Sequence, residues 1–426
     1  MVIKVLNNSC LAAIAIACMA TATVQAQDNK GTKKLSIGGY GEAVMSRNFY
    51  TDNYKRYTNA DQYEDADGHG RFDLPHVVIN IGYDFGKGWT MGSEIEFEHG
   101  GPECAVEIEE EETGEYETET ERGGEVALEQ FWIQKSWSDA INLRMGHIIV
   151  PVGLTNAHHE PNQFFGVYRP EGENTIMPCT WHQTGVSLWG NVGDWRYEAQ
   201  FVAGLEADLF GAKDWVKGGS ASPYEFDIAN KYAGVLRIDN YSVEGLRIGV
   251  SGYFGRTAGN SLKQTNYDGI DGDLMIGAID FTYDAHNWVI RGSYDYGHLG
   301  DSQKITAANK TLGKNSVSSQ TSVASAAFAA GIEAGYDLFA LSDKMRQKEQ
   351  KLYIFGRYDS YDSMYKTESA VVDNPCWSRQ MYSIGLNYRP IEQITIKGQY
   401  SYRDLDSQFN DEPSISLGVT YCGWFN

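Results

Sequence analysis

The chain has 426 residues, of which 42% are hydrophobic and 13% aromatic, and its 57 acidic and 35 basic residues give a formal net charge of −22. A surface this acidic argues against nucleic acid as a partner. The six cysteines are too scattered for a disulfide framework or a CxxC metal site.

The first 26 residues are predicted to be a secretory signal peptide. Met1 to Lys4 supplies a short positive region, "CLAAIAIACMA" is apolar, and "VQA" before Gln27 is a small-x-small cleavage site. A lipoprotein cysteine at Cys18 is the alternative. Cleavage after Ala26 removes one basic residue, Lys4, so 34 basic residues remain against 57 acidic ones, a net charge of −23.

Removing the leader also leaves four cysteines, and these are expected to be free thiols. They are Cys104, Cys179, Cys376 and Cys422. A Cys104–Cys179 bridge between neighbouring loops is the alternative.

From residue 27 to residue 426 the chain reads as one domain, an all-β transmembrane antiparallel barrel. Segments of about ten residues alternate apolar with polar side chains and end at turn residues, which is typical of outer-membrane barrels. We predict sixteen strands, near 35–48, 71–85, 89–99, 125–137, 141–150, 182–191, 195–204, 230–240, 246–256, 274–284, 288–297, 323–339, 351–360, 380–389, 394–403 and 414–425. An even number places both chain ends on the periplasmic side of a bacterial outer membrane.

The predicted connections alternate in length, as expected for short periplasmic turns and long external loops. The short ones are 86–88, 138–140, 191–194, 240–245, 285–287 and 390–393, while 340–351 is longer and is expected to carry a helical turn. The long ones are 49–70, 100–124, 151–181, 205–229, 257–273, 298–322, 361–379 and 404–413. A soluble β-sandwich, the alternative all-β fold, would not show this alternation.

Aromatic residues flank the short turns and the C-terminus on the apolar face of their strands. They are Tyr83, Phe85, Trp89, Trp137, Trp195, Tyr283, Trp288, Tyr388 and Phe425. Aromatic rings favour the headgroup level, so this set predicts a membrane girdle.

The third long loop, 151–181, is expected to fold inward and narrow the barrel. Pro151 and Gly153 end the preceding strand and let the chain turn. The residues predicted to line or brace the constriction are Arg144, His158, His159, Glu160, Phe164, Phe165, Tyr168, Arg169, Glu171 and Glu173. An external loop lying over the pore mouth is the alternative.

Two segments carry a family resemblance. "RMGHIIVPVGL" (144–154) resembles the strand-to-loop segment of the phosphate-selective porin O and P family, with its R-x-G and P-x-G pattern. "SISLGVTYCGWF" (414–425) resembles a C-terminal strand recognised by the outer-membrane assembly machinery, although Asn426 follows the final aromatic residue. The resemblance implies a sixteen-stranded porin that forms trimers. It also implies anion selectivity based on ladders of arginine and lysine.

Strand parity places charges of both signs in the lumen. The basic set is Arg144, Arg196, Arg237, Arg247, Arg291, Arg357, Arg389, Lys397 and Arg403, and the acidic set is Glu42, Glu94, Glu96, Glu98, Glu198, Asp239, Asp280, Asp295 and Asp359. Acids dominate the first three strands and bases the fifth and the thirteenth to fifteenth. This indicates a transverse field that admits small ions of both signs, and not phosphate selectivity. The alternative is that these charges pair with one another and set no selectivity.

Further expectations concern the constriction and the assembly. Glu160, Glu171 and Glu173 should face the basic wall near Arg144 across a narrow gap, and a solvated His158–His159 pair would add a modest pH dependence between about 5 and 8. Small residues in 36–44 and 325–336 predict a homotrimer whose contacts use these two strands, lying close together near barrel closure.

Residues 103–121 hold ten glutamates and no basic residue. They are interpreted as a solvated acidic loop, the alternatives being a cation-concentrating vestibule or a divalent-cation bridge to lipopolysaccharide.

The most consistent function is a porin for passive diffusion of small hydrophilic solutes and ions, in contact with outer-membrane lipids and lipopolysaccharide. No cofactor, resident metal or catalysis is expected, since His158, His159 and Glu160 lack an accompanying serine elbow. A receptor or adhesin that binds ligands through its long external loops is the alternative.

Overall fold

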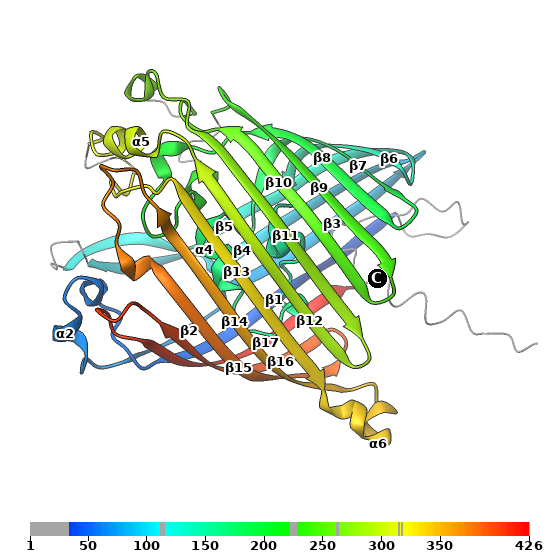
Figure 1. The fold of residues 1–426 in the computed structure, drawn as a ribbon. Coiled ribbons are helices and arrows are strands. Elements are labelled where there is room, and N and C mark those ends of the chain that lie inside the picture. Colours follow the sequence, from blue (N-terminus) through cyan, green and yellow to red (C-terminus); the bar gives the residue numbers. More distant parts are fainter. Residues whose placement is uncertain are drawn as a thin grey trace, which may run out of the picture.

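The computed structural model describes residues 34–110, 116–221, 228–260, 264–313, 316 and 318–425. The proposed signal peptide lies outside these residues. Within them the chain forms one closed antiparallel β-barrel (Figure 1). Closure comes from the last strand, which pairs with the first from Gly38 opposite Trp424 to Asn48 opposite Ser414.

The sheet has 17 strands in the described residues, but two of them, one after the other along the chain, share a single strand position, or stave, in the barrel. The strands are β1 (Leu35–Asn48), β2 (His69–Asp73), β3 (His76–Gly86), β4 (Trp89–Glu110), β5 (Tyr116–Ser138), β6 (Ile141–Ile149), β7 (His182–Val192), β8 (Trp195–Ala203), β9 (Tyr232–Val243), β10 (Leu246–Arg256), β11 (Asp273–Ala285), β12 (Trp288–Leu299), β13 (Ala326–Asp337), β14 (Lys351–Lys366), β15 (Ser378–Ile391), β16 (Ile394–Asp404) and β17 (Glu412–Trp424). Both β2 and β3 pair with β1. The barrel therefore has the sixteen staves that the sequence predicts.

Short helical turns occupy the connections. The α-helical ones are α2 (Ala60–Tyr63), α3 (Gly153–Ala157), α4 (Glu171–Ile176), α5 (Ser302–Asn309) and α6 (Asp343–Arg346). The 3-10 turns are η1 (Tyr54–Tyr57), η2 (Pro161–Gln163), η3 (Ala207–Leu209), η4 (Lys217–Ser220), η5 (Gln264–Tyr267), η6 (Leu338–Leu341) and η7 (Pro375–Trp377). Among the described residues, each helix is too short or too polar to cross a bilayer. The helical turn expected in 340–351 is present as η6 and α6.

Three predicted boundaries are wrong, one of them because β14 runs to Lys366, inside the predicted loop 361–379. The predicted strand 71–85 is interrupted between β2 and β3, where Leu74 and Pro75 leave the ladder, because proline has no N–H to donate. The predicted loop 100–124 continues as strand, since β4 and β5 pair from Glu103 opposite Gly123 to Glu110 opposite Tyr116. Residues 111–115 and the side chains of 101–125 lie outside the described part, and so do the interpretations of the acidic loop and of Cys104.

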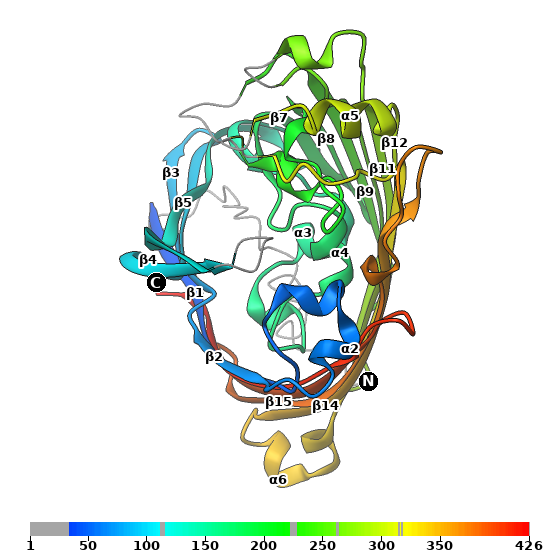
Figure 2. The ribbon, with the colours of Figure 1, turned by 90° about the vertical axis from the view of Figure 1, so that its left-hand side faces the viewer.

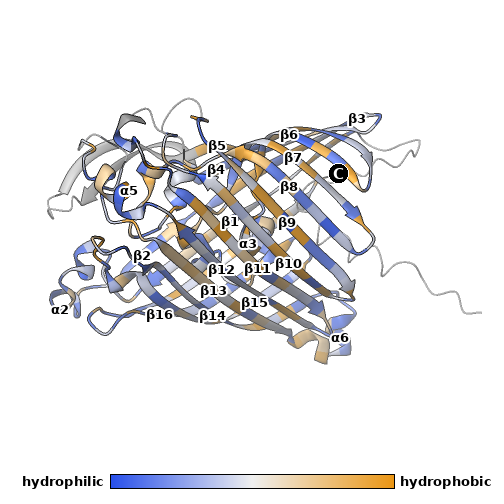
Figure 3. Cartoon of the chain, turned by 45° about the horizontal axis from the view of Figure 1, so that its top comes forward, coloured by the Kyte–Doolittle hydropathy of each residue, from blue (hydrophilic) through white to orange (hydrophobic). Residues whose placement is uncertain are grey.

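Hydrophobic and hydrophilic residues alternate along the strands (Figure 3), and many large apolar side chains of the strands are exposed, as strand parity predicts. In β9 the outward residues Tyr232, Leu236 and Ile238 are exposed, while their neighbours along the strand are buried. The aromatic residues Phe85, Trp89, Trp137, Trp195, Trp288 and Phe425 are likewise exposed. A closed barrel leaves no backbone group unpaired in lipid, and this fold with an apolar outer face locates the chain in a bacterial outer membrane.

Inside the barrel, the connection between β6 and β7 folds back into the lumen. Figure 2 shows α3 and α4 of this connection within the ring of strands. We call residues 151–181 the inward loop. Its α3 contacts β10, β11 and β12, its α4 contacts β13 and β14, and η2 contacts β17 and β1. The inward loop therefore crosses the interior and does not lie over the mouth.

A second layer of loops packs on part of the inner wall. The inward-facing residues Val235 and Ile276 are buried in one apolar cluster with Phe210 and Trp215 of the loop after β8. A Cβ on Gly297 would lie 2.1 Å from the Trp215 ring, so glycine is required where this loop approaches β12. The inner wall of β9 to β12 is thus partly apolar. Strand parity places the apolar residues on the lipid side and predicts polar residues on this inner face.

The small residues of β13 make room for the inward loop. A Cβ on Gly335 would lie 2.4 Å from the Phe165 ring, and a Cβ on Gly172 of α4 would meet Ala329 at 3.3 Å. The expectation that β13 and β1 lie nearly side by side is wrong, because β14 to β17 separate them. The homotrimer itself stays a prediction.

Candidate functional site

The inward loop is held at its start by a buried carboxylate. Gly153 has φ +79°, and a Cβ there would lie 2.4 Å from an oxygen of Glu173. Glu173 accepts hydrogen bonds from the N–H groups of Leu154 (2.6 Å) and Thr155 (2.8 Å) and from the Thr155 hydroxyl. The carboxylate therefore satisfies the N-terminal donors of α3. These bonds lie within the inward loop, and the predicted position of Glu173 across a gap from basic residues stays a prediction.

The middle of the inward loop is bonded to the inner face of β9 to β16, which we call the basic wall. The loop contributes its own backbone carbonyl groups to these bonds. Lys397 of β16 is 1% exposed. Its Nζ donates to the carbonyls of Pro161 (2.5 Å), Phe164 (3.1 Å) and Gly166 (2.8 Å). Arg389 of β15 donates to the Asn162 carbonyl at 2.8 Å. These cations bind the loop backbone, so they do not form a ladder for passing anions.

The remaining basic side chains that parity places in the lumen, apart from Arg144, pair with carboxylates. The pairs and their N···O distances are Arg196–Glu198 (2.9 Å), Arg237–Asp239 (2.8 Å), Arg237–Asp280 (3.0 Å), Arg247–Asp239 (2.8 Å), Arg247–Asp280 (2.5 Å), Arg291–Glu333 (3.3 Å) and Arg357–Asp359 (2.6 Å). Pairing of the lumen charges, one of the two sequence-based alternatives, is therefore what the structure shows for this wall.

Two further loop acids contact the wall directly. Arg403 lies 2.6 Å from Glu171 and also pairs with Glu412. Glu160 accepts from the Cys422 thiol at 3.1 Å. No open gap separates either acid from the wall, so the expected opposition across a narrow space is wrong.

Arg144 is enclosed by aromatic rings at the inner wall. Its side chain is 2% exposed, and its guanidinium carbon lies 4.3 Å from the Trp132 ring centroid and 5.7 Å from that of Trp189. Its Nε donates to Gln134 at 3.1 Å. None of these neighbours belongs to the inward loop. The expectation that Arg144 faces the loop acids is not met.

Replacing Arg144 by methionine should therefore act on stability. Cation–π contacts and a hydrogen bond of this kind together contribute about 1–3 kcal/mol, so the temperature at which the folded barrel loses its heat-modifiable mobility should fall. The reversal potential in a salt gradient should stay that of the unmodified protein. Arg346→Met, on the exposed α6, is the control for both measurements. A shift of reversal potential confined to Arg144→Met would show that the residue faces passing ions.

A second part of the inner wall, built from β1, β4 and β5, is acidic. Glu42, Glu94 and Glu96 point inward and are buried, and Glu98 is half-buried. Glu129 of β5 joins them, although period-two parity would direct it to lipid. Gln130 pairs with Glu94 and Leu128 with Ile95, so Glu129 is the extra residue of a β-bulge. The bulge turns two consecutive side chains inward.

The inward loop presents its cationic side chains to this acidic wall. His159 places Nε2 3.8 Å from Glu94 and its ring 6.1 Å from that of Tyr40. Arg169 lies close enough to Glu129, Glu96 and Glu42 for electrostatic attraction. Tyr168 between them is 39% exposed. This side of the loop faces the part of the lumen where carboxylates gather.

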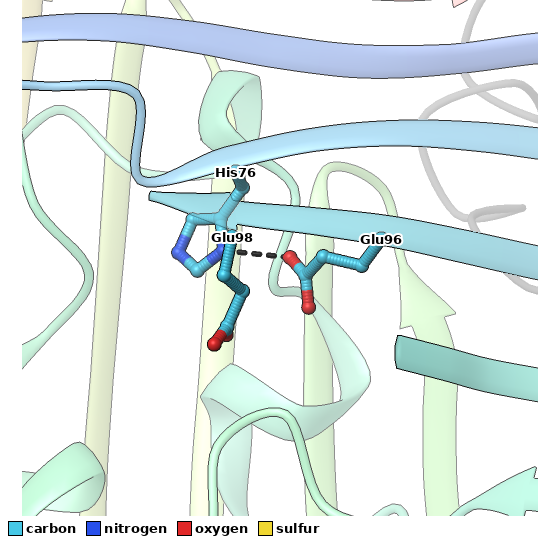
Figure 4. Close-up of side chains that lie close together, drawn as sticks. All are labelled: His76, Glu96 and Glu98. Carbon is cyan, nitrogen blue, oxygen red and sulfur yellow. Dashed lines mark hydrogen bonds and ion pairs between the residues drawn. The ribbon is translucent and has the colours of Figure 1, made fainter. Parts of the chain in front are cut away.

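His76 of β3 borders the same wall. Its Nδ1 lies 2.6 Å from Glu96, and its Nε2 lies 3.7 Å from Glu42. Figure 4 shows His76, Glu96 and Glu98 projecting together from the two adjacent strands. His76 and Glu98 are half-buried, so this group is the more open end of the acidic wall.

The histidine pair does not meet the expectation of solvated imidazoles. His159 is buried and His158 is half-buried. Burial, with Arg247 and Arg237 nearby, holds the pKa of His158 well below its ordinary value, so this ring stays neutral at physiological pH. Burial disfavours the cation at His159 too, but the nearby carboxylate of Glu94 raises its pKa overall. The expected pH dependence rested on a solvated pair and is therefore wrong in its premise.

Comparisons with known proteins agree with the fold. No protein-family profile matches the chain. A protein of Aquifex aeolicus described as uncharacterised is 27% identical over 389 residues, which cover 89% of this chain and 78% of that protein. Among solved structures, OmpF of Salmonella typhi in complex with daunomycin superposes with a TM-score of 0.53 at 10% identity, covering 91% of this chain and 97% of that one. An anion-selective porin from Comamonas acidovorans gives 0.50 at 9% identity, covering 91% and 99%. The two structural likenesses show a porin-type barrel.

Proposed function

We propose that the protein is an outer-membrane channel for passive diffusion of small hydrophilic solutes and ions, with a preference for cations. The observation that carries this proposal is the unequal neutralisation of the two walls. The basic side chains that parity places in the lumen on β9 to β16 are engaged by carboxylates or by carbonyls of the inward loop. Five carboxylates of β1, β4 and β5, namely Glu42, Glu94, Glu96, Glu98 and Glu129, face Arg169 and two histidines.

A net negative lining attracts cations and repels anions, and the effect is strongest where water is restricted. Phosphate selectivity, which the family resemblance implies, requires free basic groups along the path. Lys397 and Arg389 are instead bonded to loop carbonyls. The charge arrangement therefore supports cation preference over phosphate selectivity.

The test is conductance of the purified protein in planar bilayers. Step conductances are expected, with a reversal potential in a KCl gradient of the sign that indicates K⁺ preference. Absence of discrete steps would overturn the channel and favour the receptor or adhesin interpretation. Steps with Cl⁻ preference would retain the channel but overturn the role of the acidic wall.

The double variant Glu42→Gln and Glu98→Gln should reduce the K⁺ to Cl⁻ permeability ratio by about twofold or more at low ionic strength, where charges are least screened. Both residues belong to the acidic wall, and neither forms the bonds that hold the inward loop in place. Glu392→Gln, in the exposed turn between β15 and β16, removes a carboxylate outside the lumen and should leave the ratio unchanged. Equal ratios in both variants would place the selectivity elsewhere.

A further inference from the structure

The bulge in β5 brings together a group of side chains with metal-ligand spacing. Glu94 of β4, Glu129 of the bulge and His159 of the inward loop each direct a ligand atom to one place, with these atoms within 4.8 Å of one another. All three side chains are buried, with exposed fractions of 4%, 2% and 5%. Two belong to the barrel wall and the third to the loop that crosses the lumen.

Hydrogen bonding within the protein leaves this group unsatisfied. Glu129 Oε2 and His159 Nδ1 are both enclosed and lack a hydrogen-bond partner. A buried carboxylate without a partner is unfavourable unless a counter-charge completes it. Glu94 is already oriented, because Gln130, the other bulge residue, donates to it. The geometry is that of a coordination site whose ligands are held by their neighbours.

Arg169 does not fill this role. It lies near Glu129 and Glu96, yet its Nε and Nη2 have no hydrogen-bond partner. One guanidinium also stands against four buried carboxylates, those of Glu42, Glu94, Glu96 and Glu129. The local charge stays negative beside the arginine, so a divalent cation can bind there in addition to it.

We propose that Glu94, Glu129 and His159 bind one divalent first-row transition metal of the Zn²⁺ type. A mixed set of one imidazole and two carboxylates suits Zn²⁺ and its neighbours better than Ca²⁺ or Mg²⁺, which prefer oxygen ligands alone. The metal joins the inward loop to β4 and β5. The neighbouring His76–Glu96–Glu98 group (Figure 4), in which His76 and Glu98 are half-buried and Glu96 is buried, is the more open part of the acidic wall.

The inference is independent of the proposed transport function, and the test measures binding alone. The full-length barrel, purified in detergent and stripped with EDTA, is titrated with Co²⁺ and then with Zn²⁺. Visible d–d absorption that saturates at one Co²⁺ per chain and is displaced by Zn²⁺ is expected. His159→Ala and Glu129→Gln should each weaken binding by at least tenfold. Heat-modifiable mobility on gels selects the variants that have folded.

Matched controls remove the same chemical groups elsewhere. His286→Ala lies in the exposed turn between β11 and β12, and Glu392→Gln in that between β15 and β16, and both should bind as the unmodified protein does. Absence of saturable Co²⁺ binding in the unmodified protein would overturn the proposal. Loss of binding in His76→Ala and Glu98→Gln, with His159→Ala unaffected, would also overturn it and assign the metal to the more open group.

Discussion

Deleting residues 158–173 and joining the ends by a short glycine–serine linker is expected to raise single-channel conductance by at least about twofold. The deleted segment carries η2, the Phe165 anchor and the side chains that face the acidic wall. The two remaining ends belong to α3 and α4, which contact each other, so a short linker spans them. Removing the loop from the lumen widens the path for ions. The deletion alters no strand of the barrel, so the barrel itself is expected to keep its diameter.

The control deletes residues 343–349, which form α6 and the exposed turn after it on the short-turn side of the barrel. This variant loses chain outside the lumen and should conduct as the unmodified protein does. If removing 158–173 left conductance unchanged while the barrel stayed heat-modifiable, the inward loop would not form the narrowest part of the path.

Replacing Lys397 by methionine is expected to release the loop from the basic wall. The change retains a long side chain but leaves the carbonyls of Pro161, Phe164 and Gly166 without their buried donor. Hydrogen bonds to a charged group contribute about 1.5–3 kcal/mol each, and unpaired buried carbonyls carry a further cost. Open-channel current should become noisy, with transitions between levels, as the loop detaches and returns.

A second measurement on the same variant reports the loop directly. A cysteine introduced at Asn162, a position held in place by Arg389, should react faster with a water-soluble thiol reagent in the Lys397→Met background. The native thiols of Cys104, Cys179, Cys376 and Cys422 are first replaced by serine in every protein compared. Lys351→Met, at the exposed start of β14, is the control. Equal current noise and equal labelling in the two variants would show that the other contacts hold the loop without Lys397.

Much of this protein follows from periodicity along the chain. Alternation at every second residue is a local property, so Arg237, Asp239 and Asp280 could be placed on the inner face, and the exposed girdle residues on the outer face, without knowledge of any partner. Short and long connections identify the two ends of the barrel for the same reason. Pro151 and Gly153 also act locally, by ending β6 and permitting a positive φ.

The tertiary structure decided what those inward side chains contact. Lys397 lies more than 230 residues from the carbonyls it binds, and no pattern in the sequence indicates that it holds a loop in place. Arg144 is enclosed by Trp132 and Trp189, which come from two different strands. The pairing of a barrel side chain depends on which segment crosses the lumen, and that is set by packing between distant parts of the chain.

Glu129 shows most clearly what could not be predicted from the sequence. Strict alternation directs it to lipid, where a carboxylate is unfavourable, and that conflict was the one available signal of the bulge. A bulge arises from the register of two strands, Gln130 opposite Glu94 and Leu128 opposite Ile95, and register is a property of the pair. The sequence by itself determined a barrel with charged inner and apolar outer faces. Only the paired strands and the inward loop brought Glu94, Glu129 and His159 together, because their proximity depends on a register shift and a loop path that no single segment encodes.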